Sequence, residues 1–383
     1  MKNSVKVFDA DMHVMEDLKF VEYMDPEYRD RGPKVAAPND SFPDFVGSTL
    51  EGRVLSGPGF IYPTPESRPN AALSRISYTE GMVKYEKERA DGFGPTSQLQ
   101  ALDAEGVDVA ALYPSSTILG FPSPRTNGLD PRLSAAICRG YNDWLTDFCS
   151  IDHARLKGVA ATPIHDVEES VIEIRRAVRD NGMIAAYIRP NVINGRNLHD
   201  AYYEPLYSTL EELDVPLVVH EGTAGGPPGA DHRFLGNWVM MHMAAHPLEQ
   251  MLASESIVVG GVMERHPKLR VAFLECGCSW LVYWLWRLDE ELEAWGWHEV
   301  PWLKAKPSEY FLRQGWVSME GDEPGARYYV EMFGDDNLLW ASDYPHPDAG
   351  YPNAASEFLA LESISEETKR KTLWDNPMRF YGL

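Results

Sequence analysis

Cysteine is scarce in this chain of 383 residues, which contains only Cys138, Cys149, Cys276 and Cys278. Four cysteines are too few for a disulfide scaffold, so we expect reduced thiols and a cytoplasmic location. Cys276 and Cys278 are separated by one glycine, a spacing that could suggest a metal. No second thiol pair is present to complete a structural site, and we interpret both as small buried residues.

Basic residues are outnumbered, with 35 lysines and arginines against 58 aspartates and glutamates and a net charge of −23. So acidic a chain repels phosphates, and we expect neither nucleic acid nor an anionic membrane surface as a partner. Long hydrophobic runs are also missing, since none could cross a bilayer. Residues 1–9 contain neither a long apolar core nor a small-residue cleavage site, which predicts no secretory signal.

Short apolar runs rich in β-branched residues recur along the chain and alternate with helix-like segments. The runs cover residues 5–9, 107–113, 155–161, 183–189, 215–220, 269–275, 315–319 and 337–342. Helical patterns cover residues 96–105, 131–151, 168–181, 203–213, 238–265 and 279–294. Near-continuous hydrophobic runs are typical of parallel strands covered on both faces. The alternation predicts an α/β fold, a (β/α)8 TIM barrel, as one domain over residues 1–383.

One stretch interrupts this rhythm. Residues 17–95 are rich in proline, glycine and charge, including Gly57-Pro58-Gly59, and lie between the first two predicted strands. A segment of this length inside a compact domain is usually a lid or an oligomer contact. We expect a lid, because the segment leaves the catalytic end of strand 1; a disordered insertion is the alternative.

Polar residues follow three of the predicted strands. In such barrels the active site lies at the carboxyl ends of the strands. Asp11 and His13 follow the first run, His220 ends the fifth and Asp343 follows the eighth. Two imidazoles and two carboxylates suit one divalent metal ion, Zn²⁺ first, with Mn²⁺ or Fe²⁺ also accepted. A lone histidine at the end of an apolar strand is more often a hydrogen-bonded core residue, but the combination predicts a metal site.

The motifs around these residues resemble the amidohydrolase superfamily. They read D-A-D-M-H-V-x-E, V-V-H-E-G, G-G-V-M-E-R-H-P-K-L-R-V and A-S-D-Y-P-H-P-D. The resemblance extends to the closing N-P-x-R-F-Y-G-L and is strongest to the branch of aminocarboxymuconate-semialdehyde, resorcylate and carboxyvanillate decarboxylases. It implies Asp11, His13, His220 and Asp343 as metal ligands, with Asp343 also carrying a proton. It further implies a homodimer.

Two departures and one absence refine this resemblance. The first strand carries a carboxylate before its histidine, as in the carboxyvanillate and resorcylate enzymes, where the superfamily more often has His-x-His. Glu275 ends strand 6, where several decarboxylases of the branch carry a catalytic histidine. A carboxylate there repels an anionic substrate unless it is protonated or paired. Strand 4, residues 185–191, contains no lysine to bridge two metals, which favours one metal.

Further polar residues are candidates for the site. Arg189 could hold a substrate carboxylate or neutralise the cluster of acidic groups formed by Asp11, Asp343 and Glu275. His346 could be an acid or base beside Asp343, or simply pack between prolines, and Glu275 could be an additional acid or base. His242 and His246 share one helix face, for which a structural role is favoured. Asp9 and Glu16 are expected to accept hydrogen bonds beside the metal motif.

Two chemistries suit this set. The first is non-oxidative decarboxylation of a small cyclic or conjugated carboxylic acid, with Asp343 delivering a proton to carbon. The second is hydrolysis of an amide, lactone or carbon–carbon bond by a metal-activated water. The first is favoured by the resemblance and the carboxylate-x-His pair, the second by Glu275. A non-catalytic binding protein on the same barrel is a third hypothesis, which the complete ligand set argues against.

Overall fold

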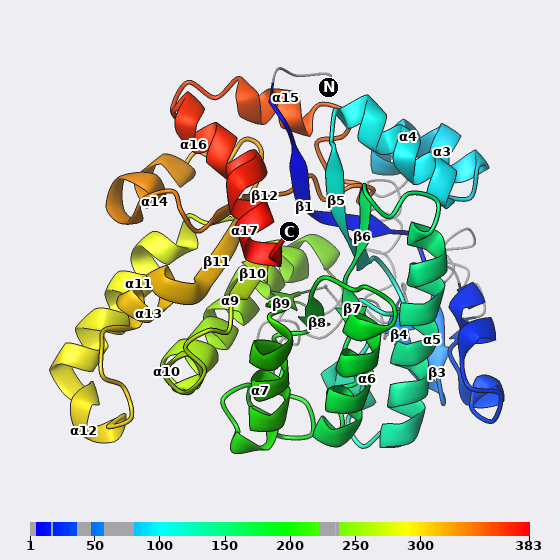
Figure 1. The fold of residues 1–383 in the computed structure, drawn as a ribbon, viewed down its shortest axis with the longest axis horizontal. Helices are drawn as coiled ribbons and strands as arrows, with labels where there is room; N and C mark the ends of the chain where they lie inside the picture. The colour runs from blue at the N-terminus through cyan, green and yellow to red at the C-terminus, as the bar shows by residue number, and fades with distance from the viewer. Residues whose placement is uncertain (1–4, 17, 37–46, 57–79, 222–233, 235–236) are drawn as a thin grey trace.

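The computed structural model describes residues 5–16, 18–36, 47–56, 80–221, 234 and 237–383. Eight strand positions form its centre (Figure 1). They are β1 (Phe8–Val14), β5 (Val109–Pro114), β6 (Leu156–Gly158) continued by β7 (Ala160–Ala161), β8 (Ala186–Ile188), β9 (Leu217–His220), β10 (Val271–Leu274), β11 (Gly315–Met319) and β12 (Leu338–Trp340). Each of the eight predicted runs overlaps one of these positions.

All barrel strands pair in parallel, in the orders β1-β5-β6 and β12-β11-β10-β9-β8-β7. Val159 alone separates β6 from β7, so one bent segment joins the two sheets. At the other edge, the backbone N–H of His13 donates to the carbonyl of Tyr344 at 2.6 Å, and that of Asp343 to Asp11 at 3.1 Å. These bonds join β1 to the end of β12 and complete the predicted (β/α)8 barrel.

Helices surround the strands (Figure 1). They are α4 (Pro95–Glu105), α5 (Pro131–Cys149), α6 (Val167–Arg179), α7 (Glu204–Leu213), α9 (Trp238–Val258), α10 (Val262–Arg265), α11 (Trp280–Glu291), α12 (Trp297–Glu299), α13 (Pro307–Gln314), α14 (Ala326–Phe333), α15 (Ala354–Leu359), α16 (Glu366–Arg370) and α17 (Asn376–Tyr381). Side-chain caps fix where some helices begin. At the start of α6, for example, the Asp166 side chain accepts hydrogen bonds from two backbone N–H groups of the first turn. The segment predicted as one helix over 238–265 is two helices, because the chain turns at Gly261 with a φ of +80°.

The last helix packs against the strands. Tyr381 of α17 stacks on Phe8 of β1 with ring centroids 5.4 Å apart, and Phe380 lies 5.4 Å from Trp316 of β11. The Tyr381 hydroxyl donates to the carbonyl of Ala10 at 2.7 Å, on the strand that carries the metal motif. The closing aromatic residues therefore brace the barrel beneath the predicted site.

The described parts of the 17–95 insertion form short elements. These are η1 (Leu18–Tyr23), η2 (Arg29–Arg31), the antiparallel strands β2 (Lys34–Val35), β3 (Ser48–Leu50) and β4 (Arg53–Ser56), η3 (Met82–Tyr85) and α3 (Glu86–Ala90). Tyr85 donates to the carbonyl of His346 at 3.0 Å, so the end of the insertion contacts the loop after β12. The Gly57-Pro58-Gly59 segment lies outside the described residues, and the lid remains a prediction.

Membrane insertion was not expected from the sequence. In the part of the chain that the structure describes, no helix has the length and apolar character needed to span a bilayer. The four cysteines are free thiols, three of them buried.

Candidate metal centre

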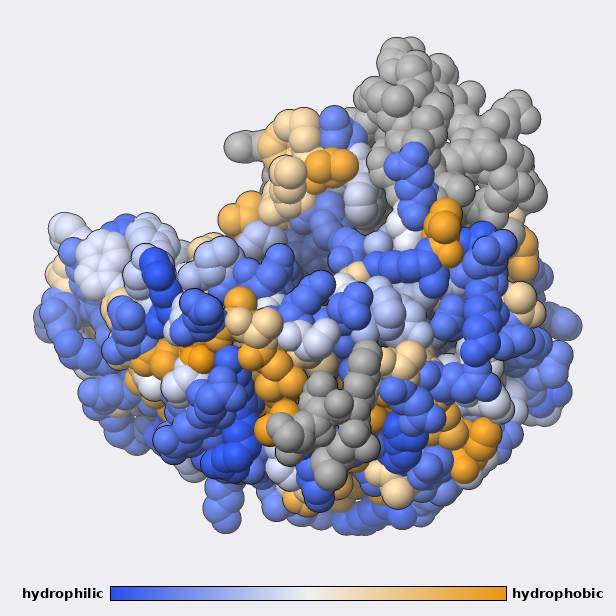
Figure 2. All heavy atoms as spheres, turned by 90° about the horizontal axis from the view of Figure 1, so that it is seen from above, coloured by the Kyte–Doolittle hydropathy of each residue, from blue (hydrophilic) through white to orange (hydrophobic). Residues whose placement is uncertain are grey.

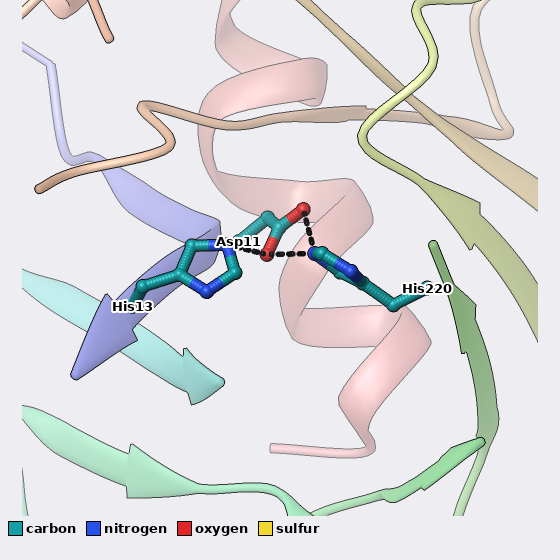
Figure 3. Close-up of side chains that lie close together, drawn as sticks. All are labelled: Asp11, His13 and His220. Carbon is teal, nitrogen blue, oxygen red and sulfur yellow. Dashed lines mark hydrogen bonds and ion pairs between the residues drawn. The ribbon is translucent and has the colours of Figure 1, made fainter. Parts of the chain in front are cut away.

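The end of β1 places its two polar side chains together inside the barrel. The pairing of β1 with β5 shifts register between Asp9 and Met12, a bulge that re-aims the side chains at this point. The Asp11 carboxylate lies between the His13 and His220 rings (Figure 3). Its Oδ1 is 3.4 Å from His13 Nε2 and 3.2 Å from His220 Nε2. The side chains of all three are at most 1% exposed.

Backbone carbonyls orient both histidines. His13 Nδ1 lies 2.7 Å from the carbonyl of Pro114, and His220 Nδ1 lies 2.8 Å from the carbonyl of Glu221. A carbonyl only accepts, so each Nδ1 carries the proton of that bond. Each Nε2 then faces Asp11, the arrangement by which proteins aim imidazoles at a metal.

Asp343 brings a second carboxylate to the same point. Its Oδ1 is 3.2 Å from His13 Nε2 and 2.7 Å from His346 Nδ1. Asp343 has a φ of +57°, a conformation uncommon for a residue other than glycine, and the surrounding structure holds it there. Its side chain is 24% exposed, whereas those of Asp11 and His13 are buried, so solvent reaches the group at Asp343.

The donor set fits a divalent cation. Asp11, His13 and His220 each offer a ligand atom within 4.8 Å of the others, and so do His13, Asp343 and His346. Among the described residues, Asp11 Oδ2 and His13 Nε2 are buried without a hydrogen-bond partner. Buried polar atoms are normally satisfied, so inward-facing nitrogen and oxygen atoms left in this state indicate a missing ligand. Nitrogen and carboxylate donors suit Zn²⁺ or Mn²⁺.

The acidic groups also shape the protonation of the metal-free site. Burial opposes charge on His220, but the neighbouring carboxylates of Asp11 and Glu275 raise its pKa to about 9. Burial likewise opposes charge on His346, and the Asp343 carboxylate raises its pKa to about 10. Burial alone would raise the pKa of Asp343, but His346 and His13 outweigh this effect and lower it. A proton therefore resides on His346, hydrogen-bonded toward Asp343.

Glu275 lies beside this group at the end of β10, with a φ of +55°. Its Oε2 is 3.4 Å from His220 Nδ1, and its Oε1 is 3.4 Å from His246 Nε2 and 3.7 Å from His346 Nδ1. Burial favours the neutral acid, but His246 and His220 together outweigh it and lower the pKa of Glu275 to about 2. Glu275 is therefore a carboxylate paired with imidazoles.

Arg189 pairs with a carboxylate other than those expected. Its Nη2 is 2.5 Å from Glu221 Oε1, both side chains are fully buried, and its Nε donates to Asn191 at 2.8 Å. The sequence suggests Asp11, Asp343 and Glu275 as the acidic groups that Arg189 neutralises, but its ion pair is with Glu221. Glu221 takes that place because it follows His220 directly and turns toward the end of β8. The pair braces the residue whose carbonyl orients His220.

Sequence reasoning missed the residues that support the ligands. The ring of Tyr113 stacks on His220 with centroids 5.5 Å apart, and its hydroxyl lies 2.7 Å from that of Tyr381. Tyr187 meets His220 edge-on at 6.1 Å. Glu221 is the glutamate of V-V-H-E-G, so its position directly after His220 is the sequence feature that could have identified it. The two tyrosines end or lie within apolar strands, where nothing local separates them from core residues.

The two acceptors expected beside the motif bond to backbone amides. Asp9 Oδ1 accepts from Asp11 at 3.2 Å and from Ser342 at 3.1 Å, so it ties the end of β12 to β1. Glu16 accepts from the amides of Ser115 and Ser116 at 2.8 and 2.9 Å, and from that of Ile118 at 3.0 Å. Both therefore set the course of the chain around the ligands.

Known proteins resemble this chain in sequence and in fold. Over 295 residues the chain is 28% identical to the 2-amino-3-carboxymuconate-6-semialdehyde decarboxylase of Dictyostelium discoideum, which covers 76% of this chain and 77% of that protein. An amidohydrolase structure from Mycobacterium avium subsp. paratuberculosis superposes with a TM-score of 0.75 at 20% identity, over 99% of this chain and all of that one.

A third structure carries a bound metal. A dihydroxybenzoic acid decarboxylase from Polaromonas sp., with manganese and the inhibitor 2-nitroresorcinol, superposes with a TM-score of 0.61 at 22% identity, over 75% of this chain and 85% of that one. The sequence profile of the family described as amidohydrolase matches residues 8–383. With that match running from the first barrel strand to the last residue, the chain belongs to the amidohydrolase family.

Proposed function

We propose that this protein is a metal-dependent, non-oxidative decarboxylase of a small cyclic or conjugated carboxylic acid. The observation that carries the proposal is the contact between Asp343 Oδ1 and His346 Nδ1, 2.7 Å apart at the exposed side of the ligand group, because this pair can supply a proton there. A proton source at that point is what replacement of a carboxylate by hydrogen requires. The names of the decarboxylases that the chain resembles support an aromatic or similarly conjugated substrate.

Asp11, His13, His220 and Asp343 are the proposed metal ligands. When bound, a divalent metal supplies positive charge that holds the substrate carboxylate and an adjacent oxygen. His346 passes its Nδ1 proton to Asp343, and Asp343 delivers that proton to the carbon that bears the carboxylate. The carbon–carbon bond then breaks, carbon dioxide leaves, and the proton stays on carbon as the new C–H bond.

Two other residues have proposed roles in this site. Glu275, held by imidazoles, faces the reacting region as a second carboxylate. Arg189 acts through Glu221 to keep His220 in place; a direct contact with a substrate carboxylate would require it to leave a fully buried ion pair. Such a move is costly, because breaking a buried pair leaves an uncompensated charge.

Hydrolysis is the second candidate, and Glu275 favours it. A carboxylate at the end of β10 can take a proton from an attacking water, as a general base does. The same ligands serve both reactions. The products separate them, since only decarboxylation releases carbon dioxide.

Finer properties belong to the same proposal. We take Zn²⁺ as the resident metal, with Mn²⁺ or Fe²⁺ as alternatives, and a cytoplasmic homodimer as the working form. The dimer is supported by large hydrophobic side chains that are 42–73% exposed near α9, α11 and α12, namely Val239, Met240, Met243, Tyr283, Trp286, Trp295 and Trp297. Hydrophobic patches interrupt an otherwise hydrophilic surface in Figure 2. Such patches are common at subunit contacts.

The test begins with metal analysis and then follows carbon dioxide. We expect about one Zn, Mn or Fe atom per chain and carbon dioxide release from at least one member of a panel of aromatic and conjugated carboxylic acids. Asp343→Asn should keep much of the metal but lower turnover by at least about a hundredfold, because an amide cannot carry the proton. Cleavage of amides or lactones without carbon dioxide release would replace decarboxylation by hydrolysis, and two metals per chain would contradict the mononuclear site.

A further inference from the structure

Helix α9 carries a line of rings along one face. Trp238, His242 and His246 are four residues apart, so they stack along that face. Their ring centroids are separated by 4.7 Å and then 4.5 Å. His246 is 5% exposed, and its Nδ1 lies 3.4 Å from the carbonyl of His242 in its own helix. Its Nε2 is therefore the nitrogen available to other elements.

That nitrogen meets Glu275. His246 Nε2 is 3.4 Å from Glu275 Oε1, while Glu275 Oε2 is 3.4 Å from His220 Nδ1. The glutamate thus lies between a proposed metal ligand on β9 and an imidazole on α9. Its φ of +55° shows that the end of β10 is held in an uncommon conformation to place the carboxylate there.

Charge explains why this contact matters. Asp11, Asp343 and Glu275 bring three carboxylates to one end of the barrel, and Arg189 is occupied by Glu221. An unpaired Glu275 would repel the carboxylate of a substrate, as like charges do at close range. The His246 imidazole lies 3.4 Å from Glu275 Oε1, close enough to share a proton with this carboxylate and balance its charge.

We propose that His246 is the positioning residue of Glu275, holding this carboxylate beside the metal group and balancing its charge. The Glu275–His246 pair then lies at the end of β10, with the imidazole supplied by helix α9. This inference deepens the proposed decarboxylase function and rests on it. His246 acts through Glu275 and has no direct part in the bond changes.

The first test is a double-mutant cycle read by Mn²⁺ binding, which needs no substrate. His246→Gln keeps a polar side chain but removes the imidazole that balances Glu275, so this carboxylate adds its charge to the ligand group and Mn²⁺ should bind about threefold to tenfold more tightly. In a Glu275→Gln background the same change should have less than a twofold effect. The matched control is His242→Gln, one turn away on the same face and 3.9 Å from Asp348, which should leave Mn²⁺ affinity unchanged.

The second test separates charge from shape. With Mn²⁺ bound, His246→Gln should weaken binding of 2,6-dihydroxybenzoate by about tenfold. Binding of 2,6-dihydroxybenzamide, its uncharged counterpart, should change less than twofold. Equal weakening of both ligands, or an unchanged Mn²⁺ affinity with no coupling to Glu275, would overturn the assignment. If His246→Gln does not fold, His246→Asn is measured in the same cycle.

These results separate the inference from the function on which it rests. Failure of the wild-type protein to release carbon dioxide from any carboxylic acid would defeat the decarboxylase proposal. The Mn²⁺ cycle would still report whether His246 and Glu275 are coupled. Carbon dioxide release together with an absent coupling would defeat only the role of His246.

Discussion

Replacing Arg189 by methionine should destabilise the fold rather than weaken substrate binding alone. Methionine keeps an unbranched apolar stem and has no charge, so the change removes the guanidinium and its ion pair with Glu221. Both side chains are fully buried at a separation of 2.5 Å. Removing one partner of a buried pair costs about 3–5 kcal/mol of unfolding free energy.

The lost contacts support that magnitude. Arg189 donates to Glu221, to Asn191 at 2.8 Å and to the carbonyl of Leu119. Hydrogen bonds to charged groups contribute about 1.5–3 kcal/mol each, so loss of two such bonds already reaches the expected range. Arg189→Met/Glu221→Gln should recover part of the loss, because the second change removes the buried charge that the guanidinium balanced.

Urea unfolding of the metal-loaded protein, followed by fluorescence and circular dichroism, measures the effect. The matched control is Arg31→Met, since Arg31 also contacts two carboxylates but has a 42% exposed side chain. It should leave the urea midpoint nearly unchanged because water screens exposed pairs. A loss below about 1 kcal/mol for Arg189→Met, with a large rise in KM, would refute the structural role and favour direct substrate contact.

Two further predictions concern histidines. Because the pKa of His220 is about 9 in the metal-free protein, Mn²⁺ must displace a proton, and its affinity should rise about tenfold per pH unit between pH 7 and 8. Calorimetry in buffers of different ionisation enthalpy reports that proton, and His220→Ala should lose both the metal and the proton release. Burial lowers the pKa of His165 to about 4, from about 6.5 when unfolded. Between these two pKa values only the unfolded chain binds the proton. The free energy of unfolding should therefore be unaffected by His165 above pH 6.5 and fall by up to about 3 kcal/mol as the pH is lowered to 4. A flatter stability profile for His165→Gln over that range would support this origin, and an unchanged slope would contradict it.

The sequence by itself determined the secondary structure, the barrel class and the positions of the proposed ligands. Eight apolar runs alternate with helical patterns, and this local periodicity reflects burial on both faces of a parallel sheet. Asp11, His13, His220 and Asp343 could be singled out because strand ends share one rim in this fold. Element boundaries were less well determined. β1 continues to Val14 instead of ending near residue 9, since pairing with β5 and with the end of β12 extends it.

Only the tertiary structure decided which charged groups meet. Glu221 as the partner of Arg189, and His246 as the partner of Glu275, depend on how separate strand ends and a helix pack together. No local pattern specifies such pairs, since a buried charge accepts whichever opposite charge the packing brings within reach. The contact between Asp11 and His220 spans 209 positions in the chain and exists only after the barrel closes. Local periodicity specifies the elements, and long-range packing specifies the chemistry at their ends.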